Sequence, residues 1–166
     1  GGSEATKFAI DPADQLSSRT AAAGVVMQRG QHFAEFTIVE GRDLYFGVIR
    51  PGWDVEGGKN AQNQPEHCFY YAVNGACYPE RNQDWVGARG LDGSPHTCVG
   101  LLIDLDVGSM TVYLNGNRVG AMVEGEEQQG RVLRGPYCWA VSMRYSHDTV
   151  RINKSKPGST DGEELY

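Results

Sequence analysis

Hydrophobic and polar residues alternate in several stretches of this 166-residue chain, and the first clear example is Gln31–Val39. A second apolar run, Leu44–Arg50, follows after the turn residues Gly41–Asp43. Successive side chains of a β-strand point to opposite faces of the sheet, so a period of two predicts a strand with one face in a core. Two such runs joined by a short turn predict a hairpin. The side chains expected to face the core are Ala34, Phe36, Ile38, Phe46 and Val48.

The most regular alternation in the chain lies in Thr97–Asp106. Two further strand patterns, Met110–Asn115 and Arg118–Met122, follow it after short turns that contain glycine. Three strands in close succession indicate an antiparallel meander, which needs no crossover helix. Its expected core residues include Val99, Leu101, Ile103, Leu105 and Val112. Other strands are expected at Cys68–Val73, Ala76–Tyr78, Tyr137–Met143 and Thr149–Asn153.

The turn residues and the absence of a long helical pattern indicate the fold class. The chain has 22 glycines and 7 prolines spread along its length. We therefore predict an all-β fold, a two-layer antiparallel β-sandwich with little helix, in residues 24–153. Residues 1–23 are interpreted as an N-terminal extension, with a leftover of protein preparation at Gly1–Glu4 and a candidate edge strand at Phe8–Ile10. Residues 154–166, rich in Lys, Ser, Pro and Gly and then acidic, are expected to be disordered.

Composition limits the partners of the protein. The formal net charge is -6, whereas a nucleic-acid surface needs clustered lysine and arginine, so nucleic acid is not expected. No apolar run reaches the roughly 18 residues that a membrane span needs, so no membrane partner is expected. The four cysteines match no CxxC spacing, and Cys98 and Cys138 lie in apolar runs. Buried thiols in a reducing compartment are favoured over disulfides, which predicts a cytoplasmic or nuclear protein.

Few residues have the spacing of a catalytic or metal site. Asp104 and Asp106 are not followed by the further ligands of a calcium loop, so we interpret them as residues that fix a turn. The pairs His67–Cys68 and His96–Cys98 lack zinc-finger spacing, and no local signature marks a Cys–His nucleophile. Whether these pairs approach one another in the fold stays open. We predict no catalytic residue, no metal and no cofactor.

Several motifs nevertheless occur in a recognisable order along the chain: Gln31–Phe36, Phe46–Val48, Val99–Asp106, Gly108, Thr111–Gly116, Gly120 and Gly135–Ser142. This order resembles the SPRY domain, in which a Gly-x-His-aromatic-x-Glu strand, a Val-Gly strand, an Asp-x-Asp turn, an aromatic-x-Asn-Gly turn and a Tyr-Pro-Ala-Val-Ser-like strand succeed one another. The resemblance covers roughly residues 24–153. It departs from the family in the loops, where a Trp-Gly-Trp-type segment is absent, and at Cys138–Trp139, where proline is usual.

The resemblance implies a function as well as a fold. SPRY domains are two-sheet sandwiches that act as interaction modules, often in ubiquitin-ligase components, Ran-binding-type scaffolds or chromatin complexes. By this resemblance the chain is expected to be a non-catalytic, monomeric domain of a larger scaffold or ubiquitin-ligase component that binds a protein or peptide. In the SOCS-box branch, a loop tyrosine and a segment after the Val-Ser strand hold an extended peptide. Tyr71 and the segment Arg144–Ser146 lie at these two positions.

Aromatic and arginine side chains in loops are favoured binding anchors because they provide a large contact area for little conformational entropy. Tyr70 and Trp85 are equally compatible with packing inside the protein, and for Trp53 both interpretations stay open. An alternative function is a lectin-like carbohydrate-binding sandwich, in which Trp53 or Trp85 stacks on a sugar. The residues expected to bind the partner are Arg50, Trp53, Tyr71, Arg144, Tyr145 and Ser146.

Overall fold

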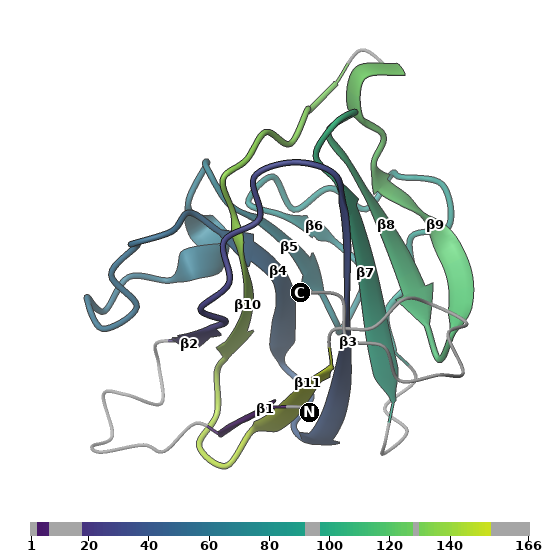
Figure 1. Ribbon diagram of the computed structural model, residues 1–166. Coiled ribbons are helices and arrows are strands. Elements are labelled where there is room, and N and C mark those ends of the chain that lie inside the picture. The colour runs from purple at the N-terminus through teal and green to yellow at the C-terminus, as the bar shows by residue number, and fades with distance from the viewer. Residues whose placement is uncertain (1–2, 7–17, 92–96, 128–129, 154–166) are drawn as a thin grey trace.

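Two antiparallel β-sheets lie face to face in the computed structural model of the protein (Figure 1). The structure describes residues 3–6, 18–91, 97–127 and 130–153. One sheet has six strands, in the order β1 (Ser3–Thr6), β11 (Thr149–Asn153), β3 (Gln31–Glu40), β7 (Cys98–Asp104), β8 (Ser109–Leu114) and β9 (Asn117–Val123). The other has five, in the order β2 (Arg19–Ala22), β10 (Cys138–Met143), β4 (Leu44–Ile49), β5 (Cys68–Tyr71) and β6 (Cys77–Tyr78).

The predicted all-β sandwich is therefore confirmed. Each predicted strand between Gln31 and Asn153 corresponds to an observed one, and β7, β8 and β9 form the expected meander. Helical structure in the described residues is limited to two short 3-10 turns, η2 (Ala61–Asn63) and η3 (Gly125–Glu127). Among those residues, no helix has the length and apolarity needed to cross a membrane.

The core lies between the two sheets and is built from the residues that the alternation selected. Phe36 on β3 meets Phe46 on β4 with 5.0 Å between ring centroids, and Trp139 on β10 at 6.2 Å. Such aromatic contacts add to the hydrophobic stabilisation that comes from burying apolar area. The predicted core residues with no exposed surface include Ala34, Phe36, Phe46, Val48, Val99, Leu101, Ile103 and Val112.

Two strands come from the segment that we had interpreted as an extension. Ser3–Thr6 forms β1 and pairs with β11, where Glu4 accepts a hydrogen bond from Arg151 at 3.2 Å. Arg19–Ala22 forms β2 and pairs with β10. The candidate edge strand Phe8–Ile10 lies outside the described residues. Both observed strands are short and have no clear alternation, which is why the pattern along the chain did not predict them.

Asp104 and Asp106 hold the turn after β7, as predicted. Asp104 Oδ1 accepts hydrogen bonds from the backbone N–H groups of Asp106 at 2.9 Å and Val107 at 3.2 Å. Asp106 Oδ1 accepts one from the backbone of Gly30 at 3.0 Å, which ties this turn to the start of β3. A hydrogen bond from Gln31 is the main cause that lowers the pKa of Asp104 below its usual value. These carboxylates are therefore occupied by the protein itself.

Gly47 permits close packing at the centre of the five-stranded sheet. It lies on β4 opposite Ala140 of β10 and Phe69 of β5. A Cβ atom at this position would overlap the backbone carbonyl of Cys68 and would lie 2.8 Å from the Cα of Phe69. Because a backbone carbonyl cannot rotate away as a flexible side chain can, β4 and β5 would have to separate to accommodate even one methyl group.

We therefore expect Gly47→Ala to lower the free energy of unfolding by about 2 kcal/mol or more, the usual cost of overpacking a well-packed interior. Gly24→Ala is the matched control, because Gly24 is exposed and a Cβ there would meet nothing within 4 Å. The control should change stability by less than about 0.5 kcal/mol. Urea denaturation followed by tryptophan fluorescence measures both, and equal midpoints for the two variants would show that the sheet relaxes easily at Gly47.

Candidate functional site: a polar pocket on the five-stranded sheet

The five-stranded sheet is apolar on both faces. All six residues of β4 and all six of β10 are buried. Half of them face the core between the sheets, and four of the others, Tyr45, Ile49, Cys138 and Ala140, belong to a second cluster on the outer face. The connection from β4 to β5, residues 50–67, packs on that outer face through Ala61, Trp53 and Val55. It covers only one part of the face, and the uncovered part is where the candidate site lies.

Three tyrosines from three strands occupy the uncovered part. Tyr45 of β4 stacks on Tyr71 of β5 with 4.4 Å between centroids and an interplanar angle of 12°. Tyr78 of β6 contacts both rings edge to face, at 5.0 Å from Tyr45 and 5.5 Å from Tyr71. The side chains alternate along each strand, so these tyrosines face outward while Phe46 and Tyr70 face the core. The cluster forms a rigid aromatic floor.

A polar pocket of about 310 Å³ opens above this floor. One wall comes from residues 60–63 around η2, and the opposite side carries two arginines, Arg81 after β6 and Arg144 after β10. Hydroxyl, amide and guanidinium groups therefore converge on one hollow. Polar groups placed around a concave surface are the usual means by which a site fixes the orientation of its ligand. The described residues that line it are Ser18, Tyr45, Asn60, Gln62, Asn63, Tyr71, Tyr78, Arg81 and Arg144.

Buried hydrogen bonds hold the η2 wall in place. The side chain of Gln62 is almost fully buried, donates to Ser18 Oγ at 3.0 Å and accepts from Ser142 Oγ of β10 at 2.8 Å. Asn60 Oδ1 accepts a hydrogen bond from the backbone of Ser18 at 3.0 Å. The wall is therefore fixed both to the sheet and to the start of β2. A pocket fixed in this way loses little conformational entropy when it binds a ligand.

The pKa values of two floor tyrosines, Tyr45 and Tyr71, are raised. Burial is the main cause that raises the pKa of Tyr45, and the neighbouring Tyr78 and Tyr71 raise it further. Burial also raises the pKa of Tyr71 to about 12, together with the hydrogen bond that its hydroxyl donates to Asp43 Oδ1 at 2.7 Å. Arg144 Nη1 lies 3.5 Å from the other oxygen of Asp43. Asp43 thus links Tyr71 to Arg144 from behind the pocket.

The structure brings two of the six predicted binding residues into this pocket, namely Tyr71 and Arg144. Tyr145 and Ser146 follow Arg144 in the same loop. Tyr145 is 50% exposed, and its backbone N–H donates to Asp148 Oδ2 at 2.9 Å, while the Arg144 guanidinium lies 5.9 Å from its ring. The segment predicted to follow the Val-Ser strand therefore borders the pocket, with Arg144 inside it and Tyr145 beside it.

Arg50 and Trp53 lie at the opposite end of β4 from Tyr45. Arg50 donates hydrogen bonds to the carbonyls of Arg134 at 2.6 Å and Pro136 at 3.0 Å, and its guanidinium lies 4.1 Å from the Tyr137 ring centroid. Trp53 is half-buried with its ring 5.2 Å from that of His67. Both side chains are engaged in holding the loops at this end, apart from the pocket that contains Tyr71.

Seven of the nine described lining residues were not among the predicted ones, and they include Tyr45, Gln62, Tyr78 and Arg81. The sequence did indicate the position of Tyr45. It lies one residue before Phe46 and three before Val48, so in a strand its side chain must face away from the core. The position of Tyr78 was indicated in a similar way, since it pairs with Phe69 across β5 and β6. Gln62 and Arg81 lie in polar connections whose sequence contains no period, so only the folded chain shows that they meet.

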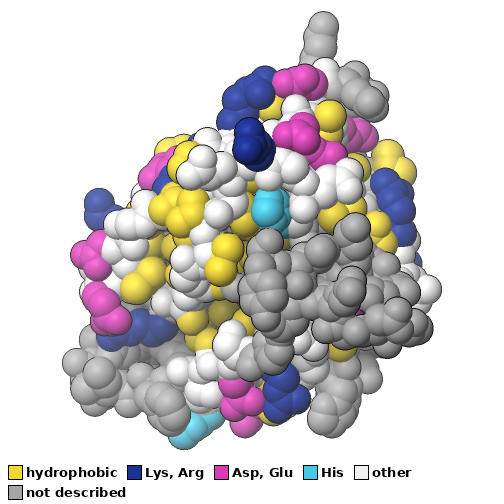
Figure 2. Space-filling model, viewed as in Figure 1, with side chains coloured by type: hydrophobic (Ala, Val, Ile, Leu, Met, Phe, Trp, Pro, Cys, Tyr) yellow, Lys and Arg dark blue, Asp and Glu magenta, His cyan; other side chains and the backbone are white. Residues whose placement is uncertain are grey.

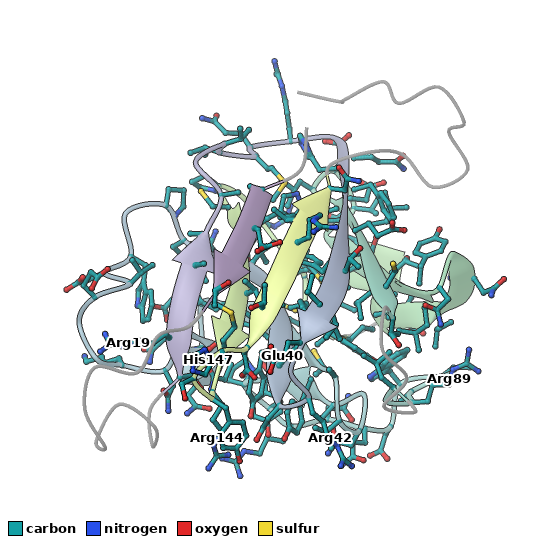
Figure 3. The ribbon with its side chains drawn as sticks, turned by 90° about the horizontal axis from the view of Figure 1, so that it is seen from below. Arg19, Glu40, Arg42, Arg89, Arg144 and His147 are labelled. Carbon is teal, nitrogen blue, oxygen red and sulfur yellow. The ribbon has the colours of Figure 1, made fainter. Side chains whose placement is uncertain are left out.

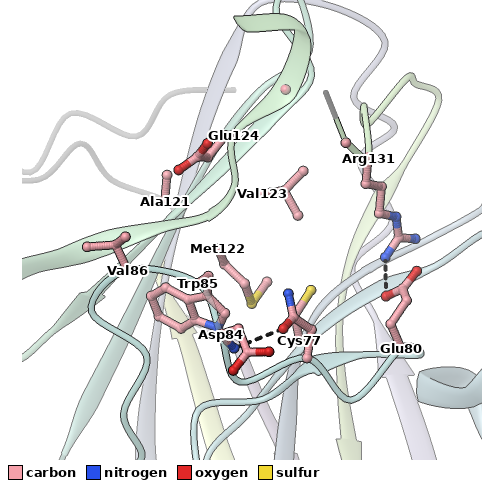
Figure 4. Close-up of a pocket in the computed structure, with 13 residues that line it drawn as sticks. Cys77, Glu80, Asp84, Trp85, Val86, Ala121, Met122, Val123, Glu124 and Arg131 are labelled. Atoms are coloured by element: carbon pink, nitrogen blue, oxygen red, sulfur yellow. Dashed lines mark hydrogen bonds and ion pairs between the residues drawn. The ribbon is translucent and has the colours of Figure 1, made fainter. Parts of the chain in front are cut away.

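A second pocket of about 380 Å³ lies between the connection after β6 and strand β9 (Figure 4). Trp85 lines it but is only 8% exposed, and its indole N–H donates to the Gly75 carbonyl at 2.9 Å, so packing is its role here. Arg131 forms an ion pair with Glu80 at 3.2 Å and donates to the backbone carbonyls of Pro65 and His67. Because its polar groups tie loops together, we take this pocket as a structural feature.

No family model and no curated protein matches the chain. Solved structures do match it, and they identify its fold. The SPRY domain of human HERC1 superposes with a TM-score of 0.65 at 16% identity, over 84% of this chain and 84% of that chain. A second human SPRY domain superposes with a TM-score of 0.54 at 18% identity, over 82% of this chain and 86% of that one. The chain therefore has the SPRY fold that its motif order indicated.

His67 is a buried titratable residue in the covering segment. Its side chain is fully buried, Nδ1 donates to the Ala61 carbonyl at 2.9 Å, and Nε2 has no partner among the described residues. Burial is the main cause that lowers the pKa of His67, and the nearby Arg50 and Arg131 lower it as well. The folded protein consequently disfavours the charged imidazolium, whereas the unfolded chain takes up the proton at its ordinary pKa of about 6.5.

We expect the stability that depends on neutral His67 to be complete above about pH 6.5 and to be lost as the pH falls below it. The measurement is urea denaturation of the wild type and of His67→Asn, whose amide can replace the Nδ1 hydrogen bond, at about pH 7.5 and about pH 5.5. The variant should lose less stability over this interval than the wild type. His147→Asn, at an exposed position, is the control and should behave as the wild type. Equal losses for the wild type and His67→Asn would contradict the assignment.

Proposed function

We propose that this domain is a non-catalytic module that binds a segment of another protein in the polar pocket above Tyr45, Tyr71 and Tyr78. The observation that carries the proposal is the pocket itself, with an aromatic floor, an amide wall and two arginines at its rim. Tyrosine and arginine are the residues most often found as energetic anchors in interfaces. The amides of Asn60 and Asn63 can bond the backbone of an extended peptide, which gives affinity independent of its side chains.

The pocket supports binding rather than catalysis. Its described lining contains no histidine, cysteine or carboxylate that could act as a nucleophile or general base, and the raised pKa values of Tyr45 and Tyr71 keep these two hydroxyls protonated at neutral pH. Among the described residues no group of three or more His, Cys, Asp and Glu side chains has the geometry of a metal site. The chemistry present is hydrogen bonding, aromatic contact and positive charge, which is the chemistry of a recognition surface.

The SPRY fold supports a place in a larger assembly. The domain of HERC1 that this chain resembles is a SPRY domain of a human protein. We propose by the same resemblance that the chain is a partner-recognition domain within a scaffold or a ubiquitin-ligase component, in the cytoplasm or the nucleus. A rigid sandwich suits this role because the loops can carry the specificity while the strands provide stability.

A lectin-like function has weaker support. Sugar rings are usually bound on an open aromatic face, and the ring of Trp85 is buried while Trp53 packs against His67. The tyrosines of the floor stack mainly on one another, which leaves less ring surface for a sugar. We therefore favour a peptide over a carbohydrate as the ligand.

The test is selection of binders from random peptides displayed on phage, using the wild-type domain as bait. The variant Asn63→Phe places an aromatic ring at the pocket mouth, and it should weaken binding of the selected peptides by about tenfold or more, which corresponds to about 1.4 kcal/mol. The matched control is Asn117→Phe, since Asn117 is exposed at the start of β9 on the other sheet. The control should bind as the wild type, and circular dichroism should show both variants folded.

Two results would contradict the proposal. Selected peptides that bind Asn63→Phe as tightly as the wild type would place the site elsewhere on the domain. A glycan array with reproducible hits, together with no enriched peptide, would favour the carbohydrate alternative.

A further inference from the structure

The charges around the polar pocket are of one sign. The charged residues that line it are Arg81 and Arg144, and the described lining contains no aspartate or glutamate. Arg81 is exposed, and its guanidinium lies 5.7 Å from the Tyr78 ring centroid. The Arg144 side chain is 44% exposed. A ligand that enters the pocket therefore meets two guanidinium groups that are accessible from solvent.

Among the described residues, Asp43 forms an ion pair with Arg144. Its side chain is only 14% exposed and accepts the hydrogen bond of Tyr71. Its distance of 3.5 Å to Arg144 is long for a charge-assisted hydrogen bond, which is usually 2.7–2.9 Å. A guanidinium has five N–H donors, so the pairing with Asp43 uses only part of what Arg144 can donate.

Positive charge continues on the surface beyond the pocket. Seen from below, Arg19, Arg42, Arg89 and Arg144 lie on the same side of the molecule, together with His147 and one labelled glutamate, Glu40 (Figure 3). Arg19 follows the lining residue Ser18, and Arg42 precedes Asp43. On the face shown in Figure 2, by contrast, acidic and basic side chains are interspersed. Of these labelled residues, Arg144 lines the pocket, in a chain whose net charge is -6.

We propose that the segment bound in this pocket is acidic, with an aspartate or glutamate carboxylate placed between Arg81 and Arg144. A guanidinium pairs with a carboxylate through two parallel hydrogen bonds, which gives both energy and orientation. Tyr45 and Tyr71 cannot repel such a carboxylate, because their raised pKa values keep them uncharged at neutral pH. This inference rests on the proposed function and adds the chemical class of the peptide.

Electrostatics favours this partner over a basic one. A complementary charge raises the rate of encounter, and like charges that are brought together cost several kcal/mol. Charges farther from the bound carboxylate than one Debye length, roughly 8 Å at physiological salt, are largely screened. Acidic residues that directly flank the bound carboxylate should therefore contribute most, and distant ones little.

The experiment uses the peptides selected on phage by the wild-type domain. The tightest one is synthesised with a fluorescent label, together with a counterpart in which each aspartate is replaced by asparagine and each glutamate by glutamine. We expect aspartate and glutamate to be enriched among the selected peptides. The uncharged counterpart should bind about tenfold or more weakly in fluorescence anisotropy.

Protein variants locate the effect. The double variant Arg81→Gln, Arg144→Gln should weaken binding of the acidic peptide by about tenfold or more, but should change binding of the uncharged counterpart by no more than about twofold. Arg118→Gln is the matched control, because Arg118 is exposed on β9 of the other sheet. It removes one positive charge by the same substitution, against two in the double variant, and should leave both affinities unchanged.

The failure of this inference and that of the proposed function give different results. Selected peptides that lose binding to Asn63→Phe but contain no excess of acidic residues would overturn the acidic partner and leave the peptide-binding pocket standing. An acidic peptide that the double variant and Arg118→Gln bind equally would overturn the placement between Arg81 and Arg144. Selected peptides that bind Asn63→Phe as tightly as the wild type would overturn both the acidic partner and the peptide-binding pocket. A selection that enriches no peptide would do the same.

Discussion

The five-stranded sheet has two apolar faces, and the need to cover both of them determines where the site lies. The inner face is covered by the six-stranded sheet. On the outer face, residues 50–67 bury Ile49, Phe69 and Ala140 but end before the tyrosine cluster. Tyrosine suits this boundary, because its ring can pack against the sheet while its hydroxyl remains bonded to polar groups. The polar pocket is thus the place where the covering segment stops, and its wall of asparagine and glutamine is the edge of that segment.

The sequence predicted the fold well where one face of a strand is buried and the other is not. Gln31–Val39 and Thr97–Asp106 alternate clearly, and their core residues are those that the alternation selects. The pattern carried less information for β4 and β10, which are apolar throughout, and none for β1 and β2, whose pairing depends on strands more than a hundred residues away. Short edge strands are held by hydrogen bonds to a neighbour that is already in place, so their own side chains need no period.

The site was harder to predict than the fold. Tyr71 and Arg144 were selected by their positions in the SPRY motif order, and they do meet. Arg50 and Trp53 were selected by residue type alone. A large ring and a guanidinium with several donors favour binding, but in the structure these two side chains use the same properties to hold loops together. Residue type does not distinguish these uses. The walls contributed by Gln62 and Arg81 come from polar connections whose course is set by contacts with the sheet, and no local pattern records such contacts.

The contacts that stabilise the fold and the residues that line the pocket lie in different parts of the domain. The contacts that stabilise the fold, between Phe36, Phe46 and Trp139, lie between the sheets, whereas the pocket lies on the far side of the five-stranded sheet. Arg81 and Arg144 contribute no side chain to either apolar cluster, so the charge at the pocket rim can change without altering the packing that supports it. Tyr45 is different, because it belongs to the outer cluster and to the pocket floor at once. The floor is therefore the fixed part of the site and the rim is the part that can vary, which places specificity in the charged residues of the loops and leaves the shape of the pocket to the strands.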